Sequence, residues 1–464
     1  MIPSLGPAVG RGPRIAIVGG GPGGLFTAWH LEQMAAGPLT VTIFEATDRL
    51  GGKVITPTFA AAPVRYEAGA AELYDYSPVG EDPLRELVES FGLPTVALGG
   101  SRVYVDDNSI ANLDDLRDSL GERTRDDLLA FDSWARSAMT PREFFSSGSD
   151  HAASAEPQGR FDATLAALPS RELRGYLEAM IHSDLATPPA ATSVAYGLQN
   201  YLMNDPAYMR LYCIAGGNEQ LIGALAARIS ATIRLGTTVE RVAANATGSL
   251  RLSLTGHGRQ EADFDIVILA LPIEALRRVE FDAGPLAAAV EAHLAHHDHP
   301  AHYLRITLLL DRPLPAAAGD DGYLMLDAFG GCCLYVESAR EPEAIHGVLG
   351  WLLGGSAAEA MAAWNDADLV AAMLETLPGP FAVCRGQVLE ARVHRWIGAV
   401  SSLPGGWQPL PEARRHRPAP ETLPGLFLVG DYLYDSTLNG VLDSAEHVAG
   451  CVAAELTDTA WETR

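Results

Sequence analysis

Positive charge is scarce in this sequence of 464 residues. Lysine occurs only once, as Lys53, and 33 lysine and arginine residues stand against 58 aspartate and glutamate residues. The formal net charge is −25 and the isoelectric point lies near 4.8. Such a chain repels polyanions, so the composition argues against nucleic acid and against an anionic membrane surface as partners.

Long hydrophobic runs are missing as well. The longest apolar stretch lies near Ile266–Leu271, which is far too short for a membrane span. The first residues, MIPSLGPAVGRGP, contain no apolar core of a secretory signal. Cysteine is rare and odd in number, with five residues, as expected in a reducing compartment. We therefore expect a cytoplasmic protein without a membrane span.

A clean pattern of metal ligands is also absent. Histidines crowd into one segment beside Asp298, but a proline interrupts this segment and the spacing matches no common metal site. These histidines are His293, His296, His297, His299 and His302. We expect no metal here, and no serine or cysteine lies in the sequence context of a catalytic nucleophile.

The strongest pattern that is present lies near the N-terminus. An apolar run at 15–18 predicts a buried strand, a glycine-rich turn follows directly, and residues 25–36 predict a helix. A second strand is expected at 41–44, with Glu45 at its end. The glycines of the turn are Gly19, Gly21 and Gly24. This order is typical of a dinucleotide-binding unit, in which the helix N-terminus binds a pyrophosphate and the acid binds the ribose hydroxyls.

The residues that follow resemble a segment of the flavoproteins with two dinucleotide-binding domains. Those proteins carry E-x-x-x-R-x-G-G-[RK] at this place, and this chain has EATDRLGGK from position 45. The resemblance implies that the dinucleotide is FAD, that Arg49 and the backbone at Gly52 grip its pyrophosphate, and that Lys53 lies nearer the flavin. A planar guanidinium suits this role because it binds phosphate oxygens in pairs.

Two later stretches also resemble known flavoproteins. Residues 215–272 resemble the second pass of the FAD domain in the flavin amine oxidase group, which would place the backbone of Val239 against the adenine. Residues 425–445 resemble the C-terminal FAD motif of the amine oxidases and carotenoid desaturases. There an acid bonds the ribityl chain, and a helix N-terminus favours negative charge on the reduced flavin. The matching residues are Gly430, Asp431, Asn439, Gly440 and Val441.

The resemblance implies an α/β protein in which a Rossmann-like FAD-binding domain is interleaved with an α+β substrate-binding domain. The FAD-binding domain would comprise 12–82, 211–275 and 412–458, and the substrate-binding domain 83–210 and 276–411. Residues 93–210 are expected to be mostly helical. The second substrate segment is expected to hold a mostly buried mixed sheet, with strands at 303–310, 334–337, 347–353 and 387–393.

The same resemblance points to residues near the flavin. Gly69 and Ala70 match a segment that brings backbone to the isoalloxazine, and Trp396 matches a tryptophan near the ring. Arg305 stands where the family usually has a lysine that holds a water at the flavin. Arginine stays protonated, so it could hold a water, a substrate carboxylate or the reduced flavin, but it cannot act as a base. Ala399 replaces the cysteine used for covalent attachment, so we expect noncovalent FAD.

Glu72 gives the sharpest indication of the substrate. The L-amino acid oxidases have an arginine near this position that binds the substrate carboxylate, whereas a carboxylate here would hold an ammonium or guanidinium group. The alternative is a structural carboxylate bonded to backbone N–H groups. Tyr74 is expected beside Glu72 at the substrate, or else in the core.

The activity implied is that of a flavin-dependent oxidoreductase. The substrate would be an amine or an amino-acid-derived small molecule, which loses a hydride from the carbon next to nitrogen to flavin N5 and becomes an imine. O2 or another acceptor would reoxidise the flavin. Two alternatives stay open: a desaturase that forms C=C bonds, as in phytoene desaturase-like or protoporphyrinogen oxidase-like enzymes, and a protein in which the flavin is regulatory. The oligomeric state is also open, with a homodimer as one option.

Overall fold

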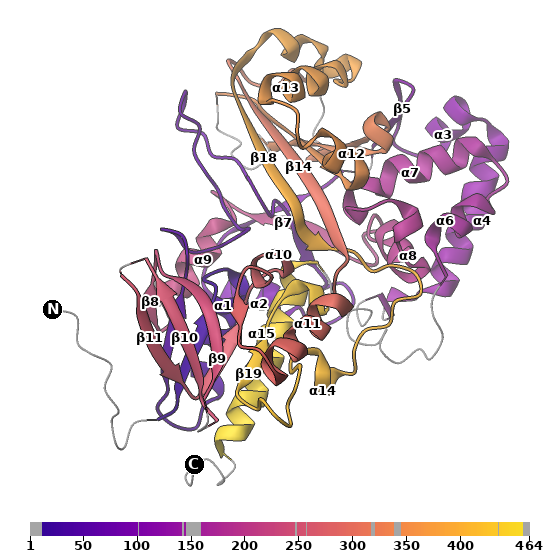
Figure 1. Ribbon diagram of the computed structural model, residues 1–464. Helices are drawn as coiled ribbons and strands as arrows, with labels where there is room; N and C mark the ends of the chain where they lie inside the picture. Colours follow the sequence, from indigo (N-terminus) through magenta and orange to yellow (C-terminus); the bar gives the residue numbers. More distant parts are fainter. Residues whose placement is uncertain are drawn as a thin grey trace. The chain divides into compact units, whose positions relative to one another are not determined.

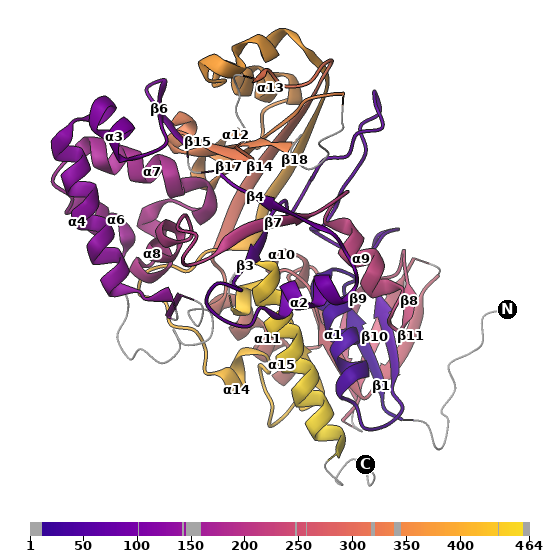
Figure 2. The ribbon, with the colours of Figure 1, turned by 180° about the vertical axis from the view of Figure 1, so that it is seen from behind.

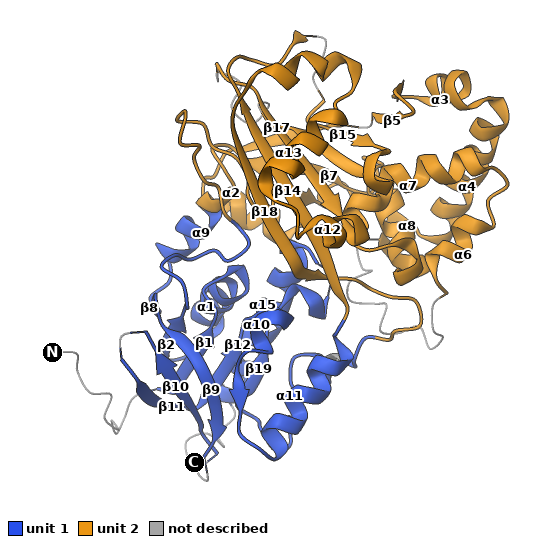
Figure 3. Cartoon of the chain, turned by 45° about the horizontal axis from the view of Figure 1, so that its top comes forward, with its two compact units in different colours: residues 1–54, 221–298, 409–464 blue, residues 55–220, 299–408 orange. Residues whose placement is uncertain are grey.

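The computed structural model describes residues 12–100, 102–141, 143–144, 159–245, 248–256, 258–316, 321–337, 345–434 and 436–457. Residue contacts divide the chain into two compact units, coloured separately in Figure 3. Unit 1 comprises residues 1–54, 221–298 and 409–464, and unit 2 comprises residues 55–220 and 299–408. Residues 55–82, which we expected in the FAD-binding domain, are grouped by their contacts with unit 2.

A five-stranded parallel sheet forms the centre of unit 1, as far as its residues are described. The strand order is β19-β12-β1-β2-β8, and each pair of neighbours is parallel. The bounds are β1 Arg14–Val18, β2 Thr40–Phe44, β8 Thr232–Arg234, β12 Ile266–Leu269 and β19 Leu426–Leu428. Almost every residue of β1 and β12 is buried, as a parallel sheet covered on both faces requires. The predicted strands at 15–18 and 41–44 are confirmed.

Helices α1 (Pro22–Met34) and α15 (Leu438–Thr457) pack against each other in unit 1 (Figures 1 and 2). Helix α1 starts three residues before the predicted start, because proline is favourable in the first turn, where its missing N–H costs nothing. Helix α9, Glu219–Ala226, crosses from unit 2 into unit 1. The other helices of unit 1 are α10 Ile273–Leu276, α11 Pro285–His296 and α14 Glu412–Arg415.

A second, smaller sheet of unit 1 has the order β11-β10-β9-β13. Its strands are β9 Thr238–Ala244, β10 Leu250–Thr255, β11 Gln260–Phe264 and β13 Glu280–Phe281. One hydrophobic core includes residues of β9, β10 and β11 together with residues of β1, β12 and β19. The two sheets of unit 1 therefore share a core.

Unit 2 contains a seven-stranded mixed sheet with the order β18-β14-β17-β16-β15-β5-β6, counted over its described residues. Its two long strands, β14 and β18, form the antiparallel pair that stands out in Figure 1. The bounds are β5 Val103–Val105, β6 Asn108–Ile110, β14 Pro300–Leu310, β15 Tyr323–Leu326, β16 Cys332–Val336, β17 Val348–Gly354 and β18 Val388–Ser401. The predicted mixed sheet is confirmed. Strand β18 runs past its predicted end at 393 because it pairs with β14 up to Pro300.

As far as they are described, residues 93–210 are mostly helical, as predicted, but they also contain short strands that were not predicted. A three-stranded sheet, β3-β7-β4, and the strands β5 and β6 contain residues of this segment. The three strands of this sheet are β3 Leu73–Asp75, β4 Thr95–Leu98 and β7 Arg210–Ile214. Asp106 and Asp107 both have positive φ, at 48° and 63°, and form the two-residue turn between β5 and β6. Strands this short give almost no alternation of apolar and polar residues in the sequence.

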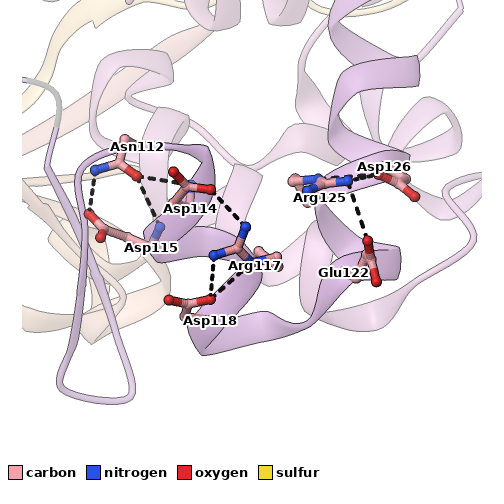
Figure 4. Close-up of polar contacts among 8 residues, drawn as sticks. All are labelled: Asn112, Asp114, Asp115, Arg117, Asp118, Glu122, Arg125 and Asp126. Atoms are coloured by element: carbon pink, nitrogen blue, oxygen red, sulfur yellow. Dashed lines mark hydrogen bonds and ion pairs between the residues drawn. The ribbon is translucent and has the colours of Figure 1, made fainter.

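Five helices described in unit 2, namely α2, α3, α7, α8 and α13, begin at a side-chain cap, as Figure 4 shows for α3. The side chain of Asn112 accepts the N–H groups of Asp114 at 2.9 Å and of Asp115 at 3.0 Å, so the helix begins at the next residue. Arg117 then pairs with Asp114 at 2.8 Å and with Asp118 at 2.9 Å. The helices are α2 Pro83–Ser90, α3 Leu113–Leu120, α4 Glu122–Ala138, α6 Phe161–Ala166, α7 Arg171–Leu185, α8 Val194–Leu202, α12 Gly355–Met361 and α13 Asp366–Glu375.

No helix in the described ranges is sufficiently long and apolar to span a membrane.

We predict that Gly24→Ala destabilises the protein by about 1–3 kcal/mol, because an added Cβ would lie 2.0 Å from the carbonyl oxygen of Gly19 and the glycine turn would have to move. Gly223→Ala is the matched control. Gly223 is an exposed residue of α9 with no atom within 4 Å of an added Cβ, so this change should stabilise by about 0.5–1 kcal/mol. Urea unfolding measures both variants. Equal effects of the two changes would contradict the tight turn.

Candidate functional site

The glycine turn of unit 1 leaves the N-terminus of α1 open. Gly21 occupies the N-cap position, and no side chain among the described residues caps this helix. The first N–H groups of a helix have no partner within the helix, so here they are available to an anion at the positive end of the helix dipole. Gly23 lies so close to Val429 and Val441 that an added Cβ would approach their side chains to 3.1 and 3.2 Å. The first turn of α15 therefore packs against the first turn of α1.

Glu45, at the carboxyl end of β2, is bonded to the glycine turn. Its Oε2 accepts the N–H of Gly20 at 2.8 Å, and its Oε1 accepts the N–H and the hydroxyl of Thr47, both at 2.8 Å. Each carboxylate oxygen has two lone pairs, so the side chain can still accept hydroxyl groups of a ribose. The N–H of Thr237 donates to the carbonyl of Glu45 at 2.8 Å, which places the start of the strand that carries Val239 beside Glu45.

Arg49 closes the loop that follows β2. Its Nη1 donates to the carbonyl of Leu50 at 2.9 Å, and its Nη2 donates to the carbonyl of Gly52 at 2.6 Å. The N–H of Gly51 donates to the carbonyl of Gly20 at 2.8 Å, so the loop lies against the glycine turn. A guanidinium has five N–H groups, and three lie outside these two bonds. The arginine is thus held in place with donors left for a phosphate.

Lys53 joins the N-terminal and C-terminal motifs of unit 1. Its Nζ lies 3.1 Å from Oδ2 of Asp431. The N–H of Gly430 donates to Oγ of Ser444 on α15, at 3.1 Å. The remaining predicted residues of this motif, Asn439, Gly440 and Val441, are buried in the first turn of α15. All predicted cofactor residues except Gly69, Ala70 and Trp396 therefore belong to unit 1, and those three belong to unit 2.

The histidine segment that we expected to be free of metal also lies partly in unit 1. His293 and His297 are one helical turn apart at the end of α11, with ring centroids separated by 4.5 Å, and both rings contact the ring of Tyr432. Asp298 forms an ion pair with Arg277. Among the residues that the structure describes, no group of three or more histidine, cysteine or acidic side chains could hold a metal ion.

We predict that acid destabilises the protein through His293. Burial, and to a lesser degree the charge of His296, lowers the pKa of His293 to about 3, against about 6.5 in the unfolded chain. A folded pKa below the unfolded value gives stability that is present above pH 6.5 and is lost as the pH falls towards 3. The difference amounts to at most about 5 kcal/mol, at 1.36 kcal/mol per pH unit. The free energy of unfolding, measured with urea between pH 7 and 4, should fall less steeply with decreasing pH for His293→Phe than for the native protein. An equally steep fall would refute this origin.

In unit 2, three side chains from separate elements hold the segment that contains Gly69 and Ala70. Each side chain donates to a carbonyl group of the segment, as far as the described residues show. Arg305 comes from β14, Trp396 from β18 and Asn218 from the residue before α9. The bonds are Arg305 Nε to Glu67 at 2.5 Å, Trp396 Nε1 to Ala68 at 2.7 Å and Asn218 Nδ2 to Ala70 at 3.0 Å. The structure thus brings together four of the predicted site residues of unit 2.

Arg305 is a buried cation with one partnered and one unpartnered nitrogen at its tip. Its side chain is only 1% exposed, and Nη2 forms an ion pair with Glu337. The guanidinium carbon lies 4.8 Å from the ring centroid of Tyr335. Burial alone would lower the pKa of Arg305, but Glu337 and the other negative groups nearby outweigh burial and raise it. Nη1 is buried and has no hydrogen-bond partner among the described residues.

Glu72 is partnered by a tyrosine. Its Oε1 accepts the hydroxyl of Tyr335 at 2.7 Å, while its Oε2 is buried and lacks a hydrogen-bond partner in the described part of the chain. Backbone N–H groups bonded to Glu72, which the structural alternative required, are not found among the described residues. The carboxylate therefore retains an oxygen that can accept a hydrogen bond from a ligand.

A second carboxylate, Asp184, lies near Glu72 in unit 2. Asp184 is at the end of α7, and the hydroxyl of Tyr303 donates to its carbonyl oxygen at 3.3 Å. Burial, and then the charge of Glu72, raises the pKa of Asp184 well above its usual range. Burial raises the pKa of Tyr74, and the charges of Asp184 and Glu72 raise it further. No ion pair to either carboxylate is found within the described ranges of the chain.

Sequence reasoning missed four of these residues, namely Asn218, Asp184, Tyr335 and Glu337. Their partners are distant in the chain, with 32 positions between Arg305 and Glu337 and 263 between Glu72 and Tyr335. No local spacing can show such pairs. The signal that was available is a charged residue directly after a fully buried apolar strand, as Glu337 follows β16.

These features define a class of protein. Unit 1 has the parallel sheet, the glycine turn and the acid after the second strand that are typical of a dinucleotide-binding domain, and unit 2 is built on the mixed sheet of a substrate domain. The family model described as "Flavin containing amine oxidoreductase" matches residues 22–453. The chain therefore belongs to this family, and it is a flavoprotein oxidoreductase with a flavin as the family cofactor.

Solved structures show the same fold. Cyclohexylamine oxidase from Brevibacterium oxydans IH-35A has a TM-score of 0.73 at 19% sequence identity, covering 96% of this chain and 99% of that chain. Putrescine oxidase bound to putrescine has a TM-score of 0.71 at 18% identity, covering 95% of this chain and 99% of that chain. At this identity the likeness concerns the fold alone.

Sequence relatives include two enzymes of tryptophan. The flavin-dependent L-tryptophan oxidase RebO of Lentzea aerocolonigenes is 26% identical over 295 residues, which are 57% of this chain and 59% of that protein. Tryptophan 2-monooxygenase of Rhizobium rhizogenes is 40% identical over 87 residues, 18% of this chain and 11% of that protein. Both matches cover less than two thirds of the relative, so the substrate must be inferred from the site.

Proposed function

We propose that this protein is an FAD-dependent amine oxidoreductase that removes a hydride from a substrate carbon next to nitrogen and, with loss of a proton from that nitrogen to solvent, gives an imine. Bound FAD would supply the hydride acceptor at flavin N5, and O2 or another acceptor would restore the oxidised flavin. The chain's own residues bind and orient the cofactor and the substrate. The family membership supports this chemistry, and the charges of unit 2 support the choice of substrate.

The residues of unit 1 suit FAD. The open N-terminus of α1 and the remaining N–H groups of Arg49 would hold the pyrophosphate, and Glu45 would accept the ribose hydroxyls. Asp431 would accept a ribityl hydroxyl while Lys53 keeps its carboxylate in place. The strand that carries Val239 starts beside Glu45, and Val239 would contact the adenine.

The observation that carries the choice of substrate is the pair of carboxylates in unit 2. Glu72 has an unpartnered buried oxygen, and Asp184 lies near it among tyrosines. Carboxylates that are partly buried and have no ion-pair partner are costly, and a bound cation would offset this cost. An ammonium or guanidinium group of the substrate therefore suits this place better than a carboxylate or a lipophilic polyene. Tyr74 would pack beside the same cation, since aromatic faces attract cations.

Arg305 and Trp396 would act beside the flavin. The guanidinium cannot take up a proton, so Arg305 would serve through its unpartnered Nη1, as a fixed donor to a water or to negative charge that develops in the reaction. Trp396 donates its ring N–H to the carbonyl of Ala68. This bond would fix the indole for packing against the flavin ring system. The role of Trp396 rests on its match to a family tryptophan, and that of Arg305 on its place at the position of the family lysine. Both roles also rest on the bonds that hold the two side chains.

We predict noncovalent attachment of the FAD. Ala399 stands at the position of the attachment cysteine and carries no nucleophile. Denaturing the purified yellow protein and passing it through a size filter should release all flavin into the filtrate, with the chromatographic mobility of FAD. Flavin that stays with the denatured polypeptide would refute this prediction.

We predict that Glu72→Gln raises KM for cationic amines by about tenfold or more, because a charge-assisted hydrogen bond contributes about 1.5–3 kcal/mol. A panel of monoamines, diamines and L-amino acids, mixed with the protein without oxygen, identifies the substrates through loss of the visible flavin absorption. KM is then measured for each amine that the enzyme accepts.

The matched control for this experiment is Glu89→Gln. Glu89 is an exposed carboxylate of unit 2 that pairs with Arg85 at 2.7 Å, and its loss should leave KM unchanged. If Glu72→Gln leaves KM for every accepted amine unchanged, the cation-binding role is wrong. If no amine reduces the flavin of the native protein, the proposed activity itself is wrong.

A further inference from the structure

Glu337 lies fully inside unit 2, opposite Arg305. Only 4% of Glu337 and 1% of Arg305 are exposed, and the two side chains form an ion pair. The adjacent strand leaves space for this pair at Gly350, where an added Cβ would lie 2.6 Å from Oε1 of Glu337. The ring of Tyr335 packs against the guanidinium. The fold is thus shaped around these two charges.

The ion pair also holds both backbone polar groups of one residue, Glu67. The carbonyl of Glu67 accepts Arg305 Nε at 2.5 Å, and the N–H of Glu67 donates to Oε2 of Glu337 at 3.2 Å. The carboxylate of Glu67 is turned to other partners, the N–H of Asn218 at 2.8 Å and the hydroxyl of Thr56 at 3.0 Å. Backbone and side chain of Glu67 are therefore both fixed, although only the backbone is fixed by the ion pair.

Gly69 and Ala70, which follow Glu67 closely in the chain, are the residues expected at the flavin. Trp396 and Asn218 hold the carbonyls of Ala68 and Ala70. The position of Gly69 and Ala70 therefore depends on a set of bonds whose first member is the peptide of Glu67. A shift of that peptide would move these residues, and a misplacement of about 1 Å is enough to slow a reaction by a factor of about 100.

We propose that Glu337 is a positioning residue of the proposed reaction. It fixes Arg305 and the peptide of Glu67, and through them it sets the place of Gly69, Ala70 and the unpartnered Nη1 of Arg305. This inference rests on the proposed amine oxidation. It goes further because it assigns a role to a residue that neither the motifs nor the comparisons indicate.

A purely structural role explains the pair less well. Apolar side chains of similar volume often replace a buried ion pair without loss of stability, because burying two charges is costly. The charges are needed if the backbone of Glu67 must be held at both its N–H and its carbonyl, and if a cation must face a ligand through a remaining N–H. Both conditions are met around Glu337.

The test compares Glu337→Gln with Asp366→Asn in the full-length holoprotein. Glutamine keeps one acceptor oxygen but removes the charge and one of the two bonds. Asp366 is the matched control because it pairs with another arginine of the same sheet, Arg395, at 2.8 Å on the protein surface. Three quantities are measured: hydrogen–deuterium exchange of the peptide that covers residues 66–71, the visible absorption of the bound flavin, and kcat and KM with the best amine of the panel.

For Glu337→Gln we expect exchange in residues 66–71 to rise by about tenfold or more while the rest of unit 2 is unchanged. The flavin band should shift, and kcat should fall by about tenfold or more with KM changed by less than about threefold. Asp366→Asn should match the native protein in all three measurements. Unchanged exchange in 66–71, or a rise spread evenly over unit 2, would overturn the positioning role.

Two further outcomes are covered. If Glu337→Gln does not fold, Arg305→Met with Glu337→Leu removes both charges together, and the same local rise in exchange is expected of it. If no amine reduces the native flavin, the proposed activity fails, but exchange and the flavin band still decide whether Glu337 holds the segment. The two failures are therefore distinguishable.

Discussion

Parallel backbone pairing of three distant chain segments is the constraint on which unit 1 depends. Strand β12 pairs on one side with β1, in the register Ile15 to Ile266, and on the other side with β19, in the register Val267 to Leu426. The carboxyl ends of parallel strands meet at one edge of a sheet, and ligands of such sheets bind there. The glycine turn, Glu45 and the Gly430–Asp431 pair follow three of these ends. The Lys53–Asp431 ion pair then links the first and the last segment.

Unit 2 depends in a similar way on how its charged side chains are compensated. Arg305 is compensated by Glu337, whereas Glu72 and Asp184 have no ion pair among the described residues. Protonation can relieve part of this cost, as the raised pKa of Asp184 shows, and a cationic ligand can relieve it as well. The arrangement is therefore consistent with an enzyme whose substrate brings the missing positive charge.

The sequence was sufficient for unit 1 because its motifs are local. A glycine turn between two apolar strands can be recognised from a stretch of about 30 residues, and the structure has each strand within about a residue of its predicted place. The roles of Gly19, Glu45, Arg49 and Asp431 stay predictions, but their mutual placement is what those roles need. The resemblance at both ends of the chain supplied what periodicity alone could not, namely FAD as the dinucleotide.

Unit 2 was less predictable because its site is made by long-range pairs. Arg305 could be singled out by its place in a strand, but its partner Glu337 lies on the other side of β17 in the sheet and follows another strand. Asp184 lies near the end of helix α7, and no motif in the sequence marks it. The strands β5 and β6 were missed because three residues each are too few to show a period, and only the Asp106–Asp107 turn marks them.

Titration of the flavin-free protein with FAD and with FMN, followed by quenching of flavin fluorescence, tests the central claim most directly. Glu45 and Val239 contact only the adenosine part of the cofactor in this account. We therefore expect one FAD per chain, bound at least about 100-fold more tightly than FMN, which lacks the adenosine and its charge-assisted hydrogen bonds. Equal affinity for the two flavins, or no binding of FAD, would contradict the account.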